Sequence, residues 1–145
     1  VNNSNIQQTP TKDMSANVNT GSSIDLSNRG LTKLTLNFSE NSSVQELNVS
    51  YNKLTGALPA EIRFLTKLKV LDASYNQFTG VPAEIGQLQN LEVLDYSYNQ
   101  LTGLPYELGN LKNLKVLNLA GNVYSEADLA VIREGLPSDV QIIVE

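Results

Sequence analysis

The stretch Leu91–Leu114 reads LEVLDYSYNQLTGLPYELGNLKNL and contains the pattern that decides the fold. Its first half follows L-x-x-L-x-h-x-x-N-x-L, where h is an apolar residue. Copies of this frame open at residues 21, 44, 68 and 114, the first of them degenerate. The openings are 23 or 24 residues apart, and a further half-unit, PSDVQI, begins at Pro137. Self-similarity at this period predicts a solenoid in which each unit stacks on the next.

Each unit is expected to contribute one short strand. Counting the opening residue as position 1, apolar residues at positions 4 and 6 alternate with mostly polar ones, which predicts a strand with one buried face. A unit holds only one such strand, so its backbone partners must come from neighbouring units, about 4.8 Å away. Strands one unit apart run in the same direction, and the sheet should therefore be parallel.

The second half of each regular unit predicts a short helical segment. In TGLPYELGNL, residues 102–111, a turn signal precedes a proline, and proline suits the first turn of a helix because it needs no hydrogen-bond acceptor there. Together with the strands, these segments predict an α/β architecture with one parallel sheet and helical segments on its other side.

Position 9 lies where the chain turns out of the strand. An asparagine side chain there can both donate to and accept from backbone groups that the turn leaves unpaired. We expect the asparagines of this column to form a structural ladder, and they are Asn52, Asn76, Asn99 and Asn122. The first unit has Arg29 at this position.

These motifs resemble the leucine-rich repeat family, because LxxLxLxxNxL followed by LTGxLPxEIGxLxxL recurs in register over residues 21–145. The resemblance implies a right-handed solenoid with a parallel sheet on its concave side and short helical segments on its convex side. The 23-residue units resemble the typical or bacterial class, and the 24-residue unit with TGALP at 55–59 resembles the plant receptor class. The resemblance also implies a protein- or peptide-binding module.

The pattern divides the chain into a leader and a repeat domain. Residues 1–20 are rich in Asn, Ser, Thr and Gln without apolar periodicity, which predicts a flexible leader or linker. We expect residues 21–43 to be a cap-like repeat, 44–124 to be regular repeats, and 125–145 to be a capping helix and strand. The initial valine indicates a processed form or a fragment. The leader is either a plain linker or a tether between an anchor and the repeats, and an extracellular or cell-surface location is favoured over a cytoplasmic one.

Composition argues against several classes of function. The net charge is −5, from 10 basic and 15 acidic residues without a basic cluster, so nucleic acid is not an expected partner. The absence of His and Cys removes the commonest catalytic bases, the thiol nucleophile and the usual transition-metal ligands. We therefore expect no enzymatic activity, cofactor or metal. No stretch has the length of a membrane span. A monomer is expected, with pairing of the exposed last strand, about residues 140–144, as the alternative.

The outward positions of the strands form the candidate binding surface. Position 8 carries a row of tyrosines, position 7 serines, position 5 acidic and amide side chains, and position 3 mostly valines. The candidate ligand-binding residues are Glu46, Asn48, Tyr51, Val70, Asp72, Ser74, Tyr75, Val93, Asp95, Ser97, Tyr98, Val116 and Asn118. Tyrosine is enriched at interface hot spots, which favours recognition, but the row can equally be a self-supporting aromatic ladder.

Charged residues on this surface allow several interpretations. Asp72 and Asp95 are like charges on adjacent strands, which either remain solvated or receive a basic side chain of a partner; calcium is disfavoured because too few oxygen ligands converge. The alternation of Lys69, Glu92 and Lys115 predicts cross-strand ion pairs.

Position 6 tests the predicted register. Tyr96 falls there beside Ala73 of the preceding unit, and a large residue beside a small one conserves local volume in a core. We expect Tyr96 to be buried, with its hydroxyl bonded to a partner at the end of the unit.

Two other functions remain compatible with the sequence. One is a structural, surface-display or adhesive repeat domain without a specific ligand. The other is carbohydrate binding by the tyrosine row.

Overall fold

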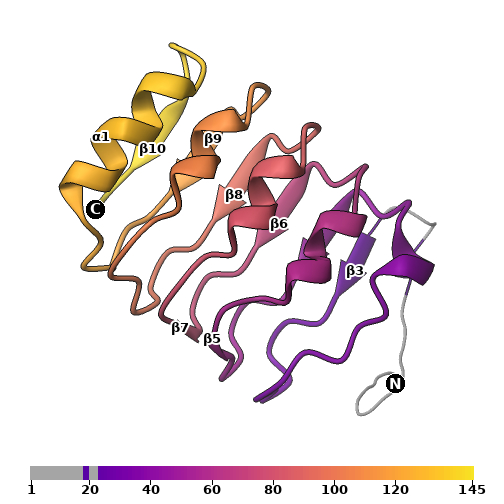
Figure 1. Cartoon of the computed structure of the whole chain (residues 1–145). Helices are drawn as coiled ribbons and strands as arrows, with labels where there is room; N and C mark the ends of the chain where they lie inside the picture. The colour runs from indigo at the N-terminus through magenta and orange to yellow at the C-terminus, as the bar shows by residue number, and fades with distance from the viewer. Residues whose placement is uncertain (1–17, 20–22) are drawn as a thin grey trace.

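The computed structural model describes residues 18–19 and 23–145, and six of its strands form a parallel stack (Figure 1). The sheet has the order β10-β9-β8-β6-β4-β3-β2. Its strands are β2 (Val18–Asn19), β3 (Ser23–Asp25), β4 (Glu46–Asn48), β6 (Val70–Asp72), β8 (Val93–Asp95), β9 (Val116–Asn118) and β10 (Gln141–Ile143). Each strand from β3 to β9 pairs with the strand of the next unit, as a solenoid requires.

The strands pair position by position. Val70 of β6 lies opposite Val93 of β8, and Asp72 lies opposite Asp95. Because the pairing register is the same throughout the stack, every position of the repeat becomes a column that crosses the sheet. The predicted strand direction and register are confirmed.

The N-terminal edge of the sheet carries one further strand. Val18 and Asn19, within the predicted flexible leader, form β2, which pairs antiparallel with β3. The sequence pattern did not predict this short strand. Residues 1–17 and 20–22 of the predicted leader and first unit lie outside the described part.

Helical segments line the other face of the sheet (Figure 1). Those of the regular units are 3₁₀-helical and each follows a proline in extended conformation, at Pro59, Pro82 and Pro105. The segments are η1 (Ser39–Asn41), η2 (Ala60–Phe64), η3 (Ala83–Gln87), η4 (Tyr106–Asn110) and the α-helix α1 (Glu126–Gly135).

Glycines let these segments approach closely. A β-carbon added at Gly86 of η3 would overlap the backbone of Glu107 in η4, and one added at Gly135 of α1 would overlap the backbone of Gly109. The units can therefore stack on the helical side at a spacing compatible with that of the strands.

The 24-residue unit adds a small second sheet. Strand β5 (Thr55–Gly56) pairs in parallel with β7 (Gln77–Phe78) at the turn after the asparagine column. Gly56 adopts a left-handed conformation, with φ 69°, and its carbonyl accepts hydrogen bonds from the backbone N–H groups of Thr79 and Gly80.

The core runs the whole length of the stack, between the sheet and the helical segments. It consists of the inward strand positions and the inward residues of the convex-side segments. Its best-buried members, each at most 1% exposed, include Leu47, Leu71, Leu94, Leu117, Ile62, Ile85, Leu108 and Ile132.

Tyr96 belongs to this core. The side chain is fully buried and packs in a tilted arrangement against Phe78, with ring centroids 5.6 Å apart. The predicted hydroxyl partner is wrong: within the described part of the chain, the Tyr96 hydroxyl has no hydrogen bond. Burial of this hydroxyl raises the pKa of Tyr96.

The asparagine column joins consecutive units, as predicted. The Asn99 Nδ2 atom donates to the carbonyl oxygens of Tyr96 and Ser97 in its own unit, at 3.0 and 3.3 Å, and to that of Ala73 in the preceding unit, at 3.0 Å. Its Oδ1 accepts from the backbone N–H of Phe78, also in the preceding unit, at 2.9 Å.

The other asparagines of the column make the same bonds. Asn76 accepts from Leu54, Asn122 accepts from Leu101, and Asn52 accepts from both Arg29 and Leu31 of the first unit. Each side chain thus satisfies groups of two units at once. Buried backbone groups need such partners, so the ladder couples the stability of each unit to that of its neighbour.

The last helix closes the core. The Ser125 hydroxyl accepts from the Asp128 N–H at 3.2 Å and forms the predicted N-cap, while Leu129 and Ile132 are buried against the stack. The Asp128 carboxylate accepts from the Leu104 N–H at 3.0 Å and ties α1 to the preceding unit. Strand β10 follows and pairs with β9, and within the described residues it is the end strand of the sheet.

Replacing Asn76 by Ala should lower the free energy of unfolding by roughly 1–3 kcal/mol, because buried groups of two units lose their partner. Chemical denaturation measures this. The control is Asn110→Ala, at an exposed position at the end of η4, which should change stability by less than about 0.5 kcal/mol. Equal effects of the two substitutions would contradict the ladder.

Replacing Tyr96 by Phe should raise the free energy of unfolding by about 1 kcal/mol, because the buried unpaired hydroxyl is removed while the ring contact with Phe78 remains. Tyr96→Ala instead leaves a cavity and should cost roughly 3–5 kcal/mol. Thermal and denaturant unfolding of both variants provide the measurement. A clear loss of stability in Tyr96→Phe would mean that the hydroxyl has a partner in solution.

Candidate binding face of the sheet

The exposed edge of the sheet face carries a stack of three tyrosine rings. The ring centroids of Tyr51 and Tyr75 are 4.4 Å apart with an interplanar angle of 8°, and those of Tyr75 and Tyr98 are 4.7 Å apart with an angle of 18°. The three side chains are 55%, 41% and 48% exposed, in chain order. The predicted aromatic ladder therefore exists, and we call Tyr51, Tyr75 and Tyr98 the tyrosine ladder.

The backbone of the ladder is left-handed, which sequence reasoning missed. The φ angles are 57° at Tyr51, 56° at Tyr75 and 58° at Tyr98. Such a conformation is uncommon for residues with a side chain and costs roughly 1–2 kcal/mol. The same column ends in Asn28, at 57°, and Gly121, at 73°. Asparagine and glycine are the residues that tolerate this conformation best, so they are the sequence signal for it.

Position 5 side chains fix the turn that leads into the ladder. The Oδ1 atom of Asp72 accepts from both the N–H and the hydroxyl of Ser74, at 3.0 and 2.6 Å, and Asp95 binds Ser97 in the same way. Asn48 makes the equivalent bonds to Ser50, at 2.9 and 2.6 Å. An amide therefore replaces a carboxylate at this position without loss of either bond.

These bonds correct the prediction for the serine row. Ser74 and Ser97 were expected to contact a ligand, but they are only 5% and 3% exposed. Their hydroxyls point back at the carboxylates two residues earlier instead of outward. They therefore support Asp72 and Asp95 instead of contacting a ligand.

The ladder ends against Gly121. A β-carbon added to Gly121 would overlap the ring of Tyr98, so the last ring lies directly over the backbone of the next unit. Tyr51 and Tyr98 cover the two faces of the Tyr75 ring. Tyr75 and the backbone of Gly121 cover the two faces of the Tyr98 ring. Tyr75 and Tyr98 consequently present ring edges and hydroxyl groups to solvent.

The remaining candidate residues share one face of the sheet. Glu46 is exposed, while the valines and the position 5 side chains are half-buried. The pairing register brings them side by side in two columns, Glu46–Val70–Val93–Val116 and Asn48–Asp72–Asp95–Asn118. The face therefore presents an aromatic row, an acidic and amide row, and an apolar row in parallel.

One of the expected cross-strand ion pairs forms on this face. Glu92 forms an ion pair with Lys115, with a separation of 3.5 Å, whereas the expected pair between Lys69 and Glu92 is absent.

Desolvation in the stack, with smaller contributions from Tyr51 and Asp95, raises the pKa of Tyr75. Tyr75 therefore carries a neutral hydroxyl at neutral pH.

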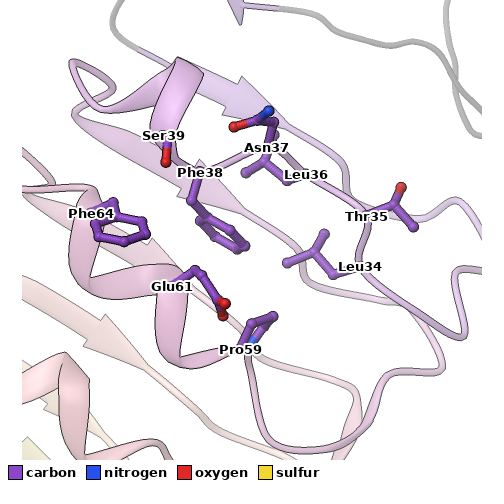
Figure 2. Close-up of a pocket in the computed structure, with 9 residues that line it drawn as sticks. All are labelled: Leu34, Thr35, Leu36, Asn37, Phe38, Ser39, Pro59, Glu61 and Phe64. Atoms are coloured by element: carbon purple, nitrogen blue, oxygen red, sulfur yellow. The ribbon is translucent and has the colours of Figure 1, made fainter.

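One cavity of about 330 Å³ lies away from this face, between the first unit and η2. Figure 2 shows Leu34 and Phe38 of the first unit pointing toward Pro59, Glu61 and Phe64 of the second. The helical segment of the degenerate first unit, η1, spans three residues, whereas η2 of the next unit spans five. The cavity lies beside this shorter segment. It contains none of the predicted site residues.

The described residues contain neither a metal-binding cluster nor a membrane-spanning helix. No group of three or more His, Asp or Glu side chains in residues 18–19 and 23–145 could hold a metal ion. Within the same residues, no helix is long and apolar enough to cross a bilayer.

Comparison with known protein families gives matches over most of the repeats. A family model described as "Leucine Rich repeats (2 copies)" matches residues 89–130, and one described as "Leucine Rich Repeat" matches residues 43–65 and 67–88. A search of curated proteins found no match.

Several solved structures are similar to the chain. A leucine-rich repeat protein of Leptospira interrogans is 40% identical, with a TM-score of 0.67, over 74% of this chain and 28% of that one. The ectodomain of the receptor kinase SOBIR1 from Arabidopsis thaliana is 32% identical, with a TM-score of 0.62, over 81% and 65%. The plant peptide hormone receptor RGFR1, solved in complex with RGF2, is 34% identical, with a TM-score of 0.59, over 71% and 17%. The chain spans less than two thirds of each of these proteins.

The left-handed backbone can be tested at Tyr75. Tyr75→Gly should unfold with a free energy about 1 kcal/mol higher than that of Tyr75→Ala, because glycine adopts positive φ without strain. Chemical denaturation of the two variants gives the comparison. In an ordinary strand position alanine would be the more stable, and that order would contradict the left-handed conformation.

Proposed function

This chain belongs to the leucine-rich repeat family, and on that premise we propose that it is a non-enzymatic module that binds a protein or peptide on the concave face of its sheet. The observation that carries the proposal is the tyrosine ladder. Three aromatic side chains are held about half exposed at the edge of this face, on a backbone conformation that costs free energy at each residue. Exposed aromatics fixed in one orientation lose little entropy on binding, which is characteristic of interface hot spots.

The similar structures support recognition of a peptide or protein. RGFR1 is described as a peptide hormone receptor and was solved with RGF2, and the SOBIR1 structure is that of a receptor ectodomain. These matches also support the proposed extracellular or cell-surface location.

The chemistry of the face favours a partner with a basic and an apolar part. Each position 5 carboxylate uses its Oδ1 atom to hold a serine, and Asp72 and Asp95 lie opposite each other on adjacent strands. In our proposal, a Lys or Arg side chain of the partner lies between these carboxylates, while its apolar groups contact the ladder and the valines Val70 and Val93. Charges then set orientation and association rate, and the aromatics supply most of the affinity.

The arrangement of the rings argues against carbohydrate binding by stacking. A sugar packs on the face of an aromatic ring, but both faces of Tyr75 are covered by Tyr51 and Tyr98, and Tyr98 lies against Gly121. A ligand at Tyr75 or Tyr98 instead meets ring edges and hydroxyl groups, which suit hydrogen bonding to peptide groups.

The domain organisation follows the same proposal. Residues 44–124 supply the binding columns, residues 21–43 cap the first regular repeat, and residues 125–145 cap the last. Residues 1–20, apart from β2, are proposed to act as a leader or linker.

Selection of peptides from a displayed random library on the whole chain tests the binding face. Selected peptides should be enriched in basic residues. Their affinity should fall by more than about 1 kcal/mol in Tyr75→Asn and Tyr98→Asn, because hot-spot contacts are lost. Asparagine is the matched substitute, since Asn28 already occupies this column with the same backbone conformation.

A second arm of this experiment addresses the charges. The double variant Asp72→Asn/Asp95→Asn should mainly slow association and weaken its salt dependence. Asn48 keeps both bonds to Ser50, so the substitution should leave the turn intact. Glu84→Ala and Gln87→Ala on η3 are the convex-side controls. If they weaken binding as much as the tyrosine variants do, or if no peptide is selected, the proposed binding face is wrong and a structural or display role is favoured.

A further inference from the structure

We propose that the tyrosine ladder is a site of oxidative cross-linking, at which a heme peroxidase with hydrogen peroxide joins Tyr75 covalently to Tyr51 or Tyr98. The product is a dityrosine bridge between consecutive repeats. This modification is independent of the proposed binding function and needs only the ring geometry of the ladder.

The geometry is that of preassembled reactants. Dityrosine forms when two phenol rings that have each lost an electron meet at the carbons next to the hydroxyl group. In the ladder, neighbouring rings are already stacked at 4.4 and 4.7 Å, close to parallel. They are anchored on adjacent turns of the stack, so their approach requires no diffusion.

Exposure allows the oxidation step. The three side chains are 41–55% exposed, which leaves their hydroxyl-bearing edges accessible to an oxidant at the surface. Because the three side chains are about half exposed, neighbouring rings can turn relative to each other at their outer edges as the new bond forms.

The reaction balances as a two-electron oxidation. Each of two phenols loses one electron and its hydroxyl proton, and the resulting radicals couple through a carbon–carbon bond between ortho positions. The hydrogen on each of these carbons then moves to the phenolic oxygen and restores aromaticity. The two hydrogen atoms removed reduce one hydrogen peroxide to two waters.

The other tyrosines of the chain lack this arrangement. Tyr96 is fully buried against Phe78, and Tyr106 is 58% exposed on η4, on the helical side. Tyr124 is half-buried after β9. The sequence contains six tyrosines, and only those of the ladder are in ring contact with another tyrosine.

A cross-link here would act as a staple between repeats. The chain has no cysteine, so it cannot form a disulfide of its own. A bridge from Tyr75 to either neighbour closes a loop of one repeat and restricts the unfolded state, as a disulfide does. The cross-linked monomer should therefore unfold at a higher denaturant concentration than the untreated chain.

The test treats the dilute whole chain with a heme peroxidase and hydrogen peroxide. We expect dityrosine fluorescence in the monomer band of a denaturing gel. Peptide mass spectrometry should find residue 75 linked to residue 51 or 98, with the loss of two hydrogen atoms. Tyr75→Phe keeps a ring in the stack but removes the central phenol, so its monomer should lose this signal. Tyr106→Phe is the matched control at an exposed, isolated position and should retain it.

Three results would overturn the proposal. The first is a wild-type monomer without dityrosine after treatment. The second is dityrosine confined to covalent dimers, which would indicate random collision of exposed phenols. The third is a Tyr75→Phe monomer as fluorescent as the wild type while its unfolding curve shows an intact fold.

Discussion

Every unit of this solenoid must turn out of a buried strand, and the turn leaves backbone N–H and C=O groups without partners inside the protein. In four of the units the side-chain amide of a position 9 asparagine, at 52, 76, 99 or 122, supplies those partners. Asn99 illustrates the constraint, since it bonds to Tyr96 and Ser97 in its own unit and to Ala73 and Phe78 in the unit before. Because the amide bonds to two units, it couples the order of each strand to that of its neighbour. The asparagine column thereby helps to align the other columns of the sheet.

The candidate binding face is built on the same turn. Position 5 holds position 7 through paired hydrogen bonds, position 8 takes the left-handed conformation, and position 9 closes the turn. The tyrosine rings project from the strained residue of this motif. On one side of it lies a serine whose hydroxyl donates to the position 5 side chain, and on the other an asparagine whose amide bonds to backbone groups. Strain at position 8 is therefore offset by hydrogen bonds on both sides of it. Binding residues and stabilising residues are adjacent in one motif, so substitutions at positions 7 and 9 should affect the face indirectly.

Much of the fold could be predicted from periodicity, because the repeat imposes one register on every column. The asparagine ladder, the buried Tyr96 and the Ser125 cap followed from residue type and position, and the structure agrees. Ser74 and Ser97 did not, because alternation alone places position 7 outward, whereas the turn has already begun there. The Tyr96 hydroxyl and strand β2 depend on tertiary surroundings that no single unit encodes. The ligand of the face likewise depends on chemistry outside the repeat pattern.

Amide hydrogen exchange in the Asn99→Ala variant tests the coupling between units most directly. The Phe78 N–H donates to Asn99, while the equivalent Leu54 N–H donates to Asn76 and serves as the internal reference. If the ladder joins the units, Phe78 should lose protection by roughly 1–3 kcal/mol beyond any change at Leu54. Equal protection changes at Phe78 and Leu54 would contradict the account.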